Sequence, residues 1–285
     1  MMTGLDIAVI GAGAIGQSIS LHLALAGHRV TLVARNERLA QLRRDGVVRT
    51  SSQAAAVHAV DALDASRAYD LVCVAVLFDD LPAVVPQLQR SAAKRIVTLF
   101  NVFDVDRLRA VLLDDSRLLL GFPTFVADVE PATGLLRTMT PSPTLVPPAL
   151  VRLFTDAGVP AAVESDMPSW LKTHASVIAT TTLALTESSH AGVGVPWSRA
   201  RLFGAATMEA LEVVRQQGHD VTPRALGWPN ALVWAILIFV VTRLGFLRAT
   251  FATKTTAEPL SLVRQILAAQ KPNHPRAVAL EIVIR

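Results

Sequence analysis

Three glycines near the start of the chain have a spacing with a chemical use. Gly11, Gly13 and Gly16 form the pattern G-x-G-x-x-G within the stretch LDIAVIGAGAIG. In such a turn the first glycine makes the bend, the second lets a pyrophosphate approach the backbone, and the third lets a helix pack closely on the strand. The helix-like stretch that follows, SISLHLALAGH, offers unpaired N–H groups and a positive dipole end to phosphates. Ala14 and Ile15, within the turn, are the other predicted cofactor-binding residues here. The order strand, turn, helix favours a dinucleotide site over a glycine turn without a ligand.

The residues after the second strand indicate which dinucleotide the turn binds. That strand, residues 28–34, is followed by Arg35, with Arg38 shortly after it. An acidic residue here usually binds the ribose 2′-hydroxyl of NAD, whereas an arginine suits the 2′-phosphate of NADP. The sequence therefore predicts NADP(H). Two alternatives stay open: Glu37 reaches the ribose instead, or the arginines belong to a solvated loop.

The elements that must position these residues alternate between strand and helix. Apolar runs typical of buried strands recur at a spacing that predicts a parallel, doubly wound sheet. A turn pair at Asp45-Gly46 ends the second helix. The predicted strands are 5–10, 28–34, 69–76, 95–100, 117–122 and 159–163, with a hairpin or an edge strand within 47–60, and the predicted helices are 37–44, 81–90, 104–113 and 151–158.

The pattern changes near residue 165, after which every periodic segment is helical. Prolines cluster between 138 and 148, and the predicted helices that follow are 168–185, 199–217 and 256–270. The fold class is therefore predicted as α/β, with an N-terminal Rossmann domain of residues 1–165 and a C-terminal all-α domain of residues 166–285. A chain of 285 residues is long enough for two cores.

Charge and cysteine content exclude some classes of function. The net charge is +4 and the basic residues are scattered, which argues against a nucleic-acid surface and allows a small anionic ligand. The single cysteine, Cys73, lies in an apolar strand-like run and predicts core packing and a reducing cytoplasm. The first residues, MMTGLD, lack a signal-peptide pattern, and no residues stand at metal-ligand spacing.

One stretch, Ala231 to Val241, is continuously apolar. Its eleven residues are too few to cross a bilayer, so no integral membrane segment is expected. A buried helix is the first prediction. A homodimer face in the helical domain and a peripheral membrane contact are the alternatives.

Four further features stand out: LVARNERLAQLRRDG at positions 32–46, YDLVCVAV at 69–76, Asn101, and Ser169-Trp170-Leu171-Lys172. Together they resemble segments of ketopantoate reductases. LVARNERLAQLRRDG at positions 32–46 is similar to the segment with their NADP-phosphate arginine, and YDLVCVAV resembles their third strand. Asn101 follows the next strand where the family has an asparagine near the nicotinamide ribose, and Ser169-Trp170-Leu171-Lys172 looks like the catalytic-lysine motif. The resemblance implies hydride transfer from NADPH to a small 2-oxo acid-like carbonyl or an imine. Lys172 would be the general acid, since an ammonium stabilises and protonates developing negative oxygen. Asn101 would be the second catalytic residue and would also bind the cofactor. A surface lysine is the alternative.

The resemblance also implies substrate-binding positions, and these depart from the family. Ser176 and Thr180 stand where the family has asparagines, and Glu258 corresponds to a late substrate-binding glutamate. Leu77 replaces a cofactor-binding lysine and Val102 a glycine. A substrate other than ketopantoate is therefore expected. The competing hypotheses are a dinucleotide-binding protein without redox turnover and a fold recruited to non-redox chemistry.

His174 lies two residues beyond the lysine, about 200° around a helix from it. That position predicts a packing or surface histidine. A proton donor to the substrate is the alternative.

Overall fold

The computed structural model describes residues 4–112, 116–130, 132–138, 142–253 and 255–284. Its contacts divide the chain into two compact units: residues 1–100 with 107–165, and residues 101–106 with 166–285. Each unit has its own hydrophobic core. The short segment 101–106 therefore lies between two stretches of the first unit along the chain but packs in the helical unit.

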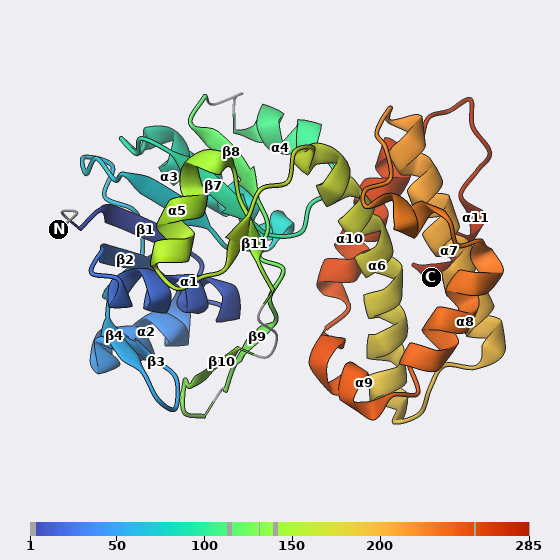
Figure 1. Cartoon of the computed structure of the whole chain (residues 1–285), viewed down its shortest axis with the longest axis horizontal. Helices are drawn as coiled ribbons and strands as arrows, with labels where there is room; N and C mark the ends of the chain where they lie inside the picture. Colours follow the sequence, from blue (N-terminus) through green and yellow to red (C-terminus); the bar gives the residue numbers. More distant parts are fainter. Residues whose placement is uncertain (1–3, 113–115, 131, 139–141, 254, 285) are drawn as a thin grey trace. The chain divides into compact units, whose positions relative to one another are not determined.

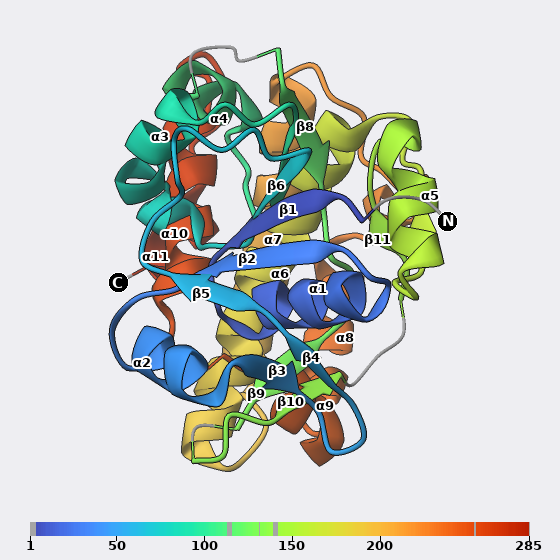
Figure 2. The same cartoon turned by 90° about the vertical axis from the view of Figure 1, so that its left-hand side faces the viewer.

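A six-stranded parallel sheet forms the centre of the first unit (Figure 2). The strand order is β5-β2-β1-β6-β7-β8, with β1 in the middle and every pairing parallel. The inner strands are buried almost throughout, which explains their unbroken apolar sequences. The strands are β1 (Asp6–Ile10), β2 (Arg29–Val33), β5 (His58–Val60), β6 (Leu71–Val74), β7 (Ile96–Leu99) and β8 (Leu118–Gly121). The predicted Rossmann-type α/β fold is confirmed.

Helices and small two-stranded sheets complete this unit. Gly46, in the left-handed conformation at φ 68°, ends α2 at the predicted turn. The stretch 47–60 contains both predicted alternatives, since β3 and β4 form a hairpin and β5 joins the main sheet edge. The predicted helix 104–113 is α4, and Leu113 lies outside the described residues. The remaining elements are α1 (Ala14–Leu25), α2 (Asn36–Asp45), β3 (Val47–Arg49), β4 (Ala54–Ala56), η1 (Phe78–Asp80), α3 (Leu81–Arg90), α4 (Val105–Val111), β9 (Ala127–Val129), β10 (Leu136–Thr138), β11 (Thr144–Leu145), α5 (Pro148–Asp156) and β12 (Ala161–Ala162).

The second unit is built from helices packed around α6 and α7 (Figure 1). Asp166 caps the first of them, because its Oδ1 accepts a hydrogen bond from Ser169 N at 3.1 Å. Gly204 lets α7 and α8 approach closely, since a Cβ there would come 2.5 Å from Ala231 O. The elements are α6 (Met167–Ala191), α7 (Trp197–Gln216), η2 (Arg224–Gly227), α8 (Ala231–Val241), α9 (Gly245–Phe251), α10 (Ala257–Ala269) and α11 (Val278–Val283).

The prediction that residues 231–241 form a buried helix is half wrong. The helix exists with those bounds as α8, but only Trp234, Ala235 and Ile238 are buried. These residues face α7 and α6, and large apolar side chains on the other side are exposed. A sequence that is apolar all round does not reveal how many neighbours cover the helix.

No single helix of the described residues is both long and apolar enough to cross a membrane. The helices α8 and α9 satisfy that test only as a pair, bent by 97° at the break between them.

Candidate functional site

The glycine turn has the geometry that its spacing predicts. Gly11 has φ 103°, a conformation that favours glycine, and Gly16 packs so closely that a Cβ there would lie 1.8 Å from Gly11 O. In contrast, no heavy atom lies within 4 Å of the Cβ position of Gly13. The fold itself therefore requires glycine at positions 11 and 16, whereas Gly13 leaves the backbone open to an approaching group.

The start of α1 offers hydrogen-bond donors beside this open position. Ala14 and Ile15 are its first helical residues, and Gly13 at the N-cap supplies no side-chain acceptor. The N–H groups at this end therefore suit the oxygens of a phosphate. The residues fit the pyrophosphate of a dinucleotide.

Gln17 supports the same turn from within the core. Its side chain is buried, and Nε2 donates to Ala12 O at 2.8 Å. This bond fixes the carbonyl between the first two glycines. No sequence signal marked Gln17, because a glutamine early in a helix is ordinarily exposed.

Arg35 lies at the carboxyl end of β2, at the N-cap of α2, with an exposed side chain. Its Nη2 is 3.6 Å from Asp80 Oδ1 of η1, and both side chains are about half exposed. Arg38 Nη1 donates to Gln41 Oε1 at 2.6 Å along the same helix. Arg35 is thus the cation more open to a ligand phosphate, with Asp80 as a competitor.

The side chain of Gln265 in α10 holds the backbone of the segment 101–106. Gln265 Oε1 accepts hydrogen bonds from Phe103 N at 3.1 Å and Asp104 N at 3.3 Å. Gln265 is buried, and Phe103 belongs to the core of the helical unit. Sequence reasoning missed Gln265, because it stands in an amphipathic helix where a polar residue predicts exposure.

Asn101 and Glu258, both predicted site residues, are in direct contact. Asn101 Nδ2 donates to Glu258 Oε1 at 2.8 Å, and Glu258 lies in the first turn of α10, where the helix dipole favours a carboxylate. An ionised carboxylate only accepts hydrogen bonds, so Asn101 must present its NH₂ group to it. Its carbonyl oxygen Oδ1 is buried and has no hydrogen-bond partner among the described residues. This oxygen is available to accept from a ligand hydroxyl or amide.

Lys172 is buried in the helical unit, with 1% of its surface exposed. Its Nζ lies 5.0 Å from the ring centroid of Phe103, within cation–π distance. The alternative of a surface lysine is therefore wrong. Lysine is rarely buried to this extent, because removing an ammonium from water is costly.

The hydroxyls of Ser176 and Thr180 are engaged within the helical unit, and their substrate-binding role stays a prediction. Both are fully buried on the side of α6 that packs on α7. Ser176 Oγ donates to Lys172 O at 2.8 Å, and Thr180 Oγ1 pairs with Thr207 Oγ1 of α7 at 2.7 Å. Hydroxyls are short, so they pair inside the helix interface.

Packing explains the positions of His174 and Cys73. His174 stacks on Trp170 with ring centroids 4.7 Å apart, and burial lowers the pKa of His174 to about 4. A neutral imidazole at neutral pH suits packing better than proton donation. Burial raises the pKa of Cys73 to about 12, so its thiol is unreactive. No cluster of potential metal ligands occurs among the described residues.

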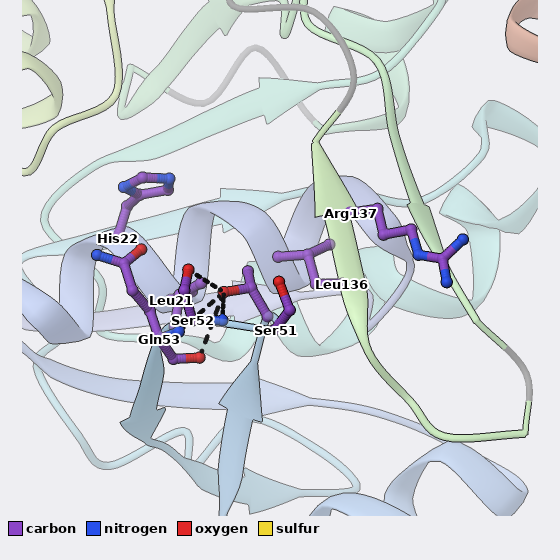
Figure 3. Close-up of a pocket in the computed structure, with 8 residues that line it drawn as sticks. Leu21, His22, Ser51, Ser52, Gln53, Leu136 and Arg137 are labelled. Atoms are coloured by element: carbon purple, nitrogen blue, oxygen red, sulfur yellow. Dashed lines mark hydrogen bonds between the residues drawn. The ribbon is translucent and has the colours of Figure 1, made fainter.

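A polar pocket of about 390 Å³ lies elsewhere on the first unit (Figure 3). Leu21 and His22 of α1 line it, together with the β3–β4 turn and Arg137 of β10. His22 is two turns along α1 from the glycine turn. The pocket is therefore separate from the dinucleotide site, and the hydroxyl of Thr50 in its wall is engaged within the β3–β4 turn itself.

Comparison with known proteins supports the family and the fold. Residues 7–146 match the family model described as Ketopantoate reductase PanE/ApbA. No curated protein sequence matches the chain.

Solved structures match both units. D-mandelate dehydrogenase, in a ternary structure with NADH and anilino(oxo)acetate, is 11% identical over 98% of this chain and 95% of that chain, with a TM-score of 0.75. A PanE/ApbA family ketopantoate reductase from Ralstonia eutropha JMP134 is 18% identical over 98% and 95%, with a TM-score of 0.74. A 2-dehydropantoate 2-reductase from Porphyromonas gingivalis W83 is 19% identical over 98% of each chain, with a TM-score of 0.69. At these identities the likeness establishes the fold.

Proposed function

Because the chain belongs to the ketopantoate reductase family as a divergent member, we propose that it is an NADP-dependent reductase of small carbonyl compounds. The substrate is a 2-oxo acid-like carbonyl or an imine. Neighbours of the same fold are named as reductases and dehydrogenases, and one was solved with NADH and anilino(oxo)acetate. NADPH, when bound, supplies the hydride that reduces the substrate carbon.

The glycine turn and Arg35 hold the dinucleotide in this proposal. The open backbone at Gly13 and the N–H groups of Ala14 and Ile15 bind the pyrophosphate. Arg35 binds the 2′-phosphate through charge-assisted hydrogen bonds. Asn101 accepts a hydrogen bond from the nicotinamide riboside through Oδ1, the buried oxygen for which the described part of the chain supplies no partner.

Lys172 is the general acid, and its burial is the observation that carries the reductase proposal. Reduction of a carbonyl places negative charge on its oxygen, and a buried ammonium stabilises that charge far better than an exposed one. Lys172 Nζ then gives a proton to the oxygen, which yields the hydroxyl product. Phe103 packs beside the ammonium and excludes water from it.

The substrate differs from ketopantoate in this proposal. The positions of the family asparagines are Ser176 and Thr180, whose hydroxyls are used between α6 and α7. Leu77, half exposed after β6, adds an apolar side chain where the resemblance implies a lysine. Fewer polar contacts favour a less polar substrate, with Glu258 as the remaining charged contact.

The same observations favour a second candidate, a dinucleotide-binding protein without redox turnover. Loss of the polar substrate contacts is expected if no substrate is bound. In that case Lys172 and Asn101 bind only the dinucleotide.

Measuring NADPH consumption against a panel of 2-oxo acids, ketones and imines separates the two candidates. Turnover of any panel member, with formation of the matching hydroxy compound or amine, supports the reductase. Saturable NADPH binding in a fluorescence titration, with no oxidation of NADPH by any panel member, favours the binding protein. Absence of NADPH binding would overturn both.

A further inference from the structure

The exposed side of α8 is a continuous apolar surface. Its five large side chains follow the spacing i, i+1, i+4, i+5, i+8, which places them within one stripe of the helix. Each is between 41% and 56% exposed. We call them the α8 stripe: Leu232, Val233, Ile236, Leu237 and Val240.

Exposed aromatic side chains lie at both ends of the stripe along the chain. Trp228, 84% exposed, precedes the helix, and Phe246, 66% exposed, follows it in α9. Tryptophan has an apolar ring with one polar N–H group and is enriched where lipid meets water.

Positive charge accompanies the stripe, and negative charge is absent from the same stretch of sequence. No aspartate or glutamate occurs between Asp220 and Glu258. Arg243 Nη1 donates to Phe239 O at 2.7 Å and Arg248 Nη1 to Thr242 O at 2.9 Å, so both guanidinium groups are held at the C-terminal end of α8.

Arg224 is exposed in η2, just before the other end of α8. An arginine has five N–H donors, and one such bond leaves donors for phosphate oxygens. An apolar stripe with cations at both ends is complementary to a surface that is apolar within and anionic outside.

From this pattern we propose that the α8 stripe and its flanking arginines bind the surface of an anionic lipid bilayer. The eleven residues of α8 extend about 16 Å, half the thickness of a bilayer core, so the helix lies along the surface without spanning it. Apolar burial and attraction to anionic headgroups act together, as in other interfacial helices.

A second copy of the chain fits the stripe less well. A two-fold axis brings the same patch of both copies together. Antiparallel pairing of α8 would then place Arg243 and Arg248 of each copy near the other copy's Arg224, with no acidic residue of the stretch between them.

Vesicle sedimentation with the full chain tests the proposal. The wild-type protein is expected to sediment with vesicles of phosphatidylglycerol and phosphatidylcholine, less so at high salt, and to stay in the supernatant with phosphatidylcholine alone. Ile236→Asp, within the stripe, should weaken binding by about tenfold or more. Ile282→Asp is the matched control, because Ile282 is an isoleucine on helix α11 with similar exposure, 43% against 46%. It should bind as the wild type does.

A charge variant and the oligomeric state complete the test. Arg224→Glu leaves the stripe intact and should also weaken binding to the anionic vesicles. Circular dichroism spectra and NADPH titration check that each variant is folded. The proposal is overturned if the wild-type protein does not bind anionic vesicles, or if Ile236→Asp binds them with the affinity of the wild type. It is also overturned if light scattering shows a dimer that Ile236→Asp dissociates, which would make a second copy the occupant.

Discussion

Replacing Arg35 with alanine should convert an NADPH-selective protein into one that scarcely distinguishes NADPH from NADH. In the proposed complex the Arg35 guanidinium binds the 2′-phosphate, which only NADPH carries. A charge-assisted hydrogen bond of this kind contributes about 1.5–3 kcal/mol. Arg35→Ala should therefore weaken NADPH binding roughly 10- to 150-fold and leave NADH binding within about twofold.

Asp80 competes with the 2′-phosphate for Arg35, so the strengths of the two contacts have to be compared. Its Oδ1 lies 3.6 Å from Arg35 Nη2, but both side chains are about half exposed. Such a surface ion pair contributes about 0–1 kcal/mol, less than the phosphate contact that would replace it. Asp80→Asn should accordingly strengthen NADPH binding by at most about fivefold.

Nicotinamide fluorescence titrations give the two dissociation constants for each variant. Arg38→Ala is the matched control, because Arg38 is engaged with Gln41 of its own helix and should lose much less affinity. Equal NADPH and NADH affinities in the wild type would refute the assignment. An equal loss for both cofactors in Arg35→Ala would show that Arg35 acts on the fold and not on the phosphate.

Further substitutions at Gly13, Gly16, Gln265 and His174 test other parts of the molecule. Gly13→Val should fold, since φ −73° suits valine and the Cβ position is open, yet abolish dinucleotide binding, whereas Gly16→Ala should lower the melting temperature. Gln265→Leu should reduce kcat and lower the free energy of unfolding by about 1–3 kcal/mol, because Phe103 N loses its buried acceptor; Gln265→Glu should partly restore kcat. Acidification from neutral pH to about pH 5 should lower the free energy of unfolding of the wild type by about 2 kcal/mol through His174 alone. The His174→Phe protein should lack this part of the decrease, as measured by urea unfolding at each pH.

The sign of the histidine effect follows from the direction of its pKa shift. Burial holds the pKa of His174 near 4, below its ordinary value of 6.5, so the unfolded chain takes up the proton first as the pH falls. The stability is fully present above pH 6.5 and declines toward pH 4. Burial also lowers the pKa values of His22 and His28. Both histidines are present in the wild type and in His174→Phe, so the difference between the two proteins reports His174 alone. Equal pH slopes in both proteins would contradict the assignment.

The other two substitutions also have contradicting results. A folded Gly13→Val protein that binds NADPH tightly would show that the phosphates lie elsewhere. An unchanged kcat in Gln265→Leu would show that its bonds to the segment 101–106 stabilise the fold without positioning the site.

The sheet could be predicted from sequence because its inner strands are buried on both faces. Such strands are continuous apolar runs, as in Leu71–Val74 and Ile96–Leu99. Shorter elements were missed: the β9–β10 hairpin and the six-residue α11 are too brief to show a period. The exposed side of α8 was predicted only as an alternative, because exposure depends on neighbours distant in sequence.

The cofactor half of the site was more predictable than the substrate half. The glycine turn is local, so spacing fixes its geometry. The contact of Asn101 with Glu258 joins residues 157 positions apart, and no spacing rule reaches that far. The burial of Lys172 and the engaged hydroxyls of Ser176 and Thr180 are likewise consequences of helix packing. The cytoplasmic location stays a prediction.

Single-turnover hydride transfer in Lys172→Met, compared with the wild type, tests the central claim most directly. Methionine fills much of the buried volume beside Phe103 but has no proton to give. With a substrate that the wild type reduces, the rate of NADPH oxidation should fall by about 10²-fold or more, while NADPH affinity stays within about twofold. Hydride transfer at the wild-type rate in a folded Lys172→Met protein would show that Lys172 is not the general acid.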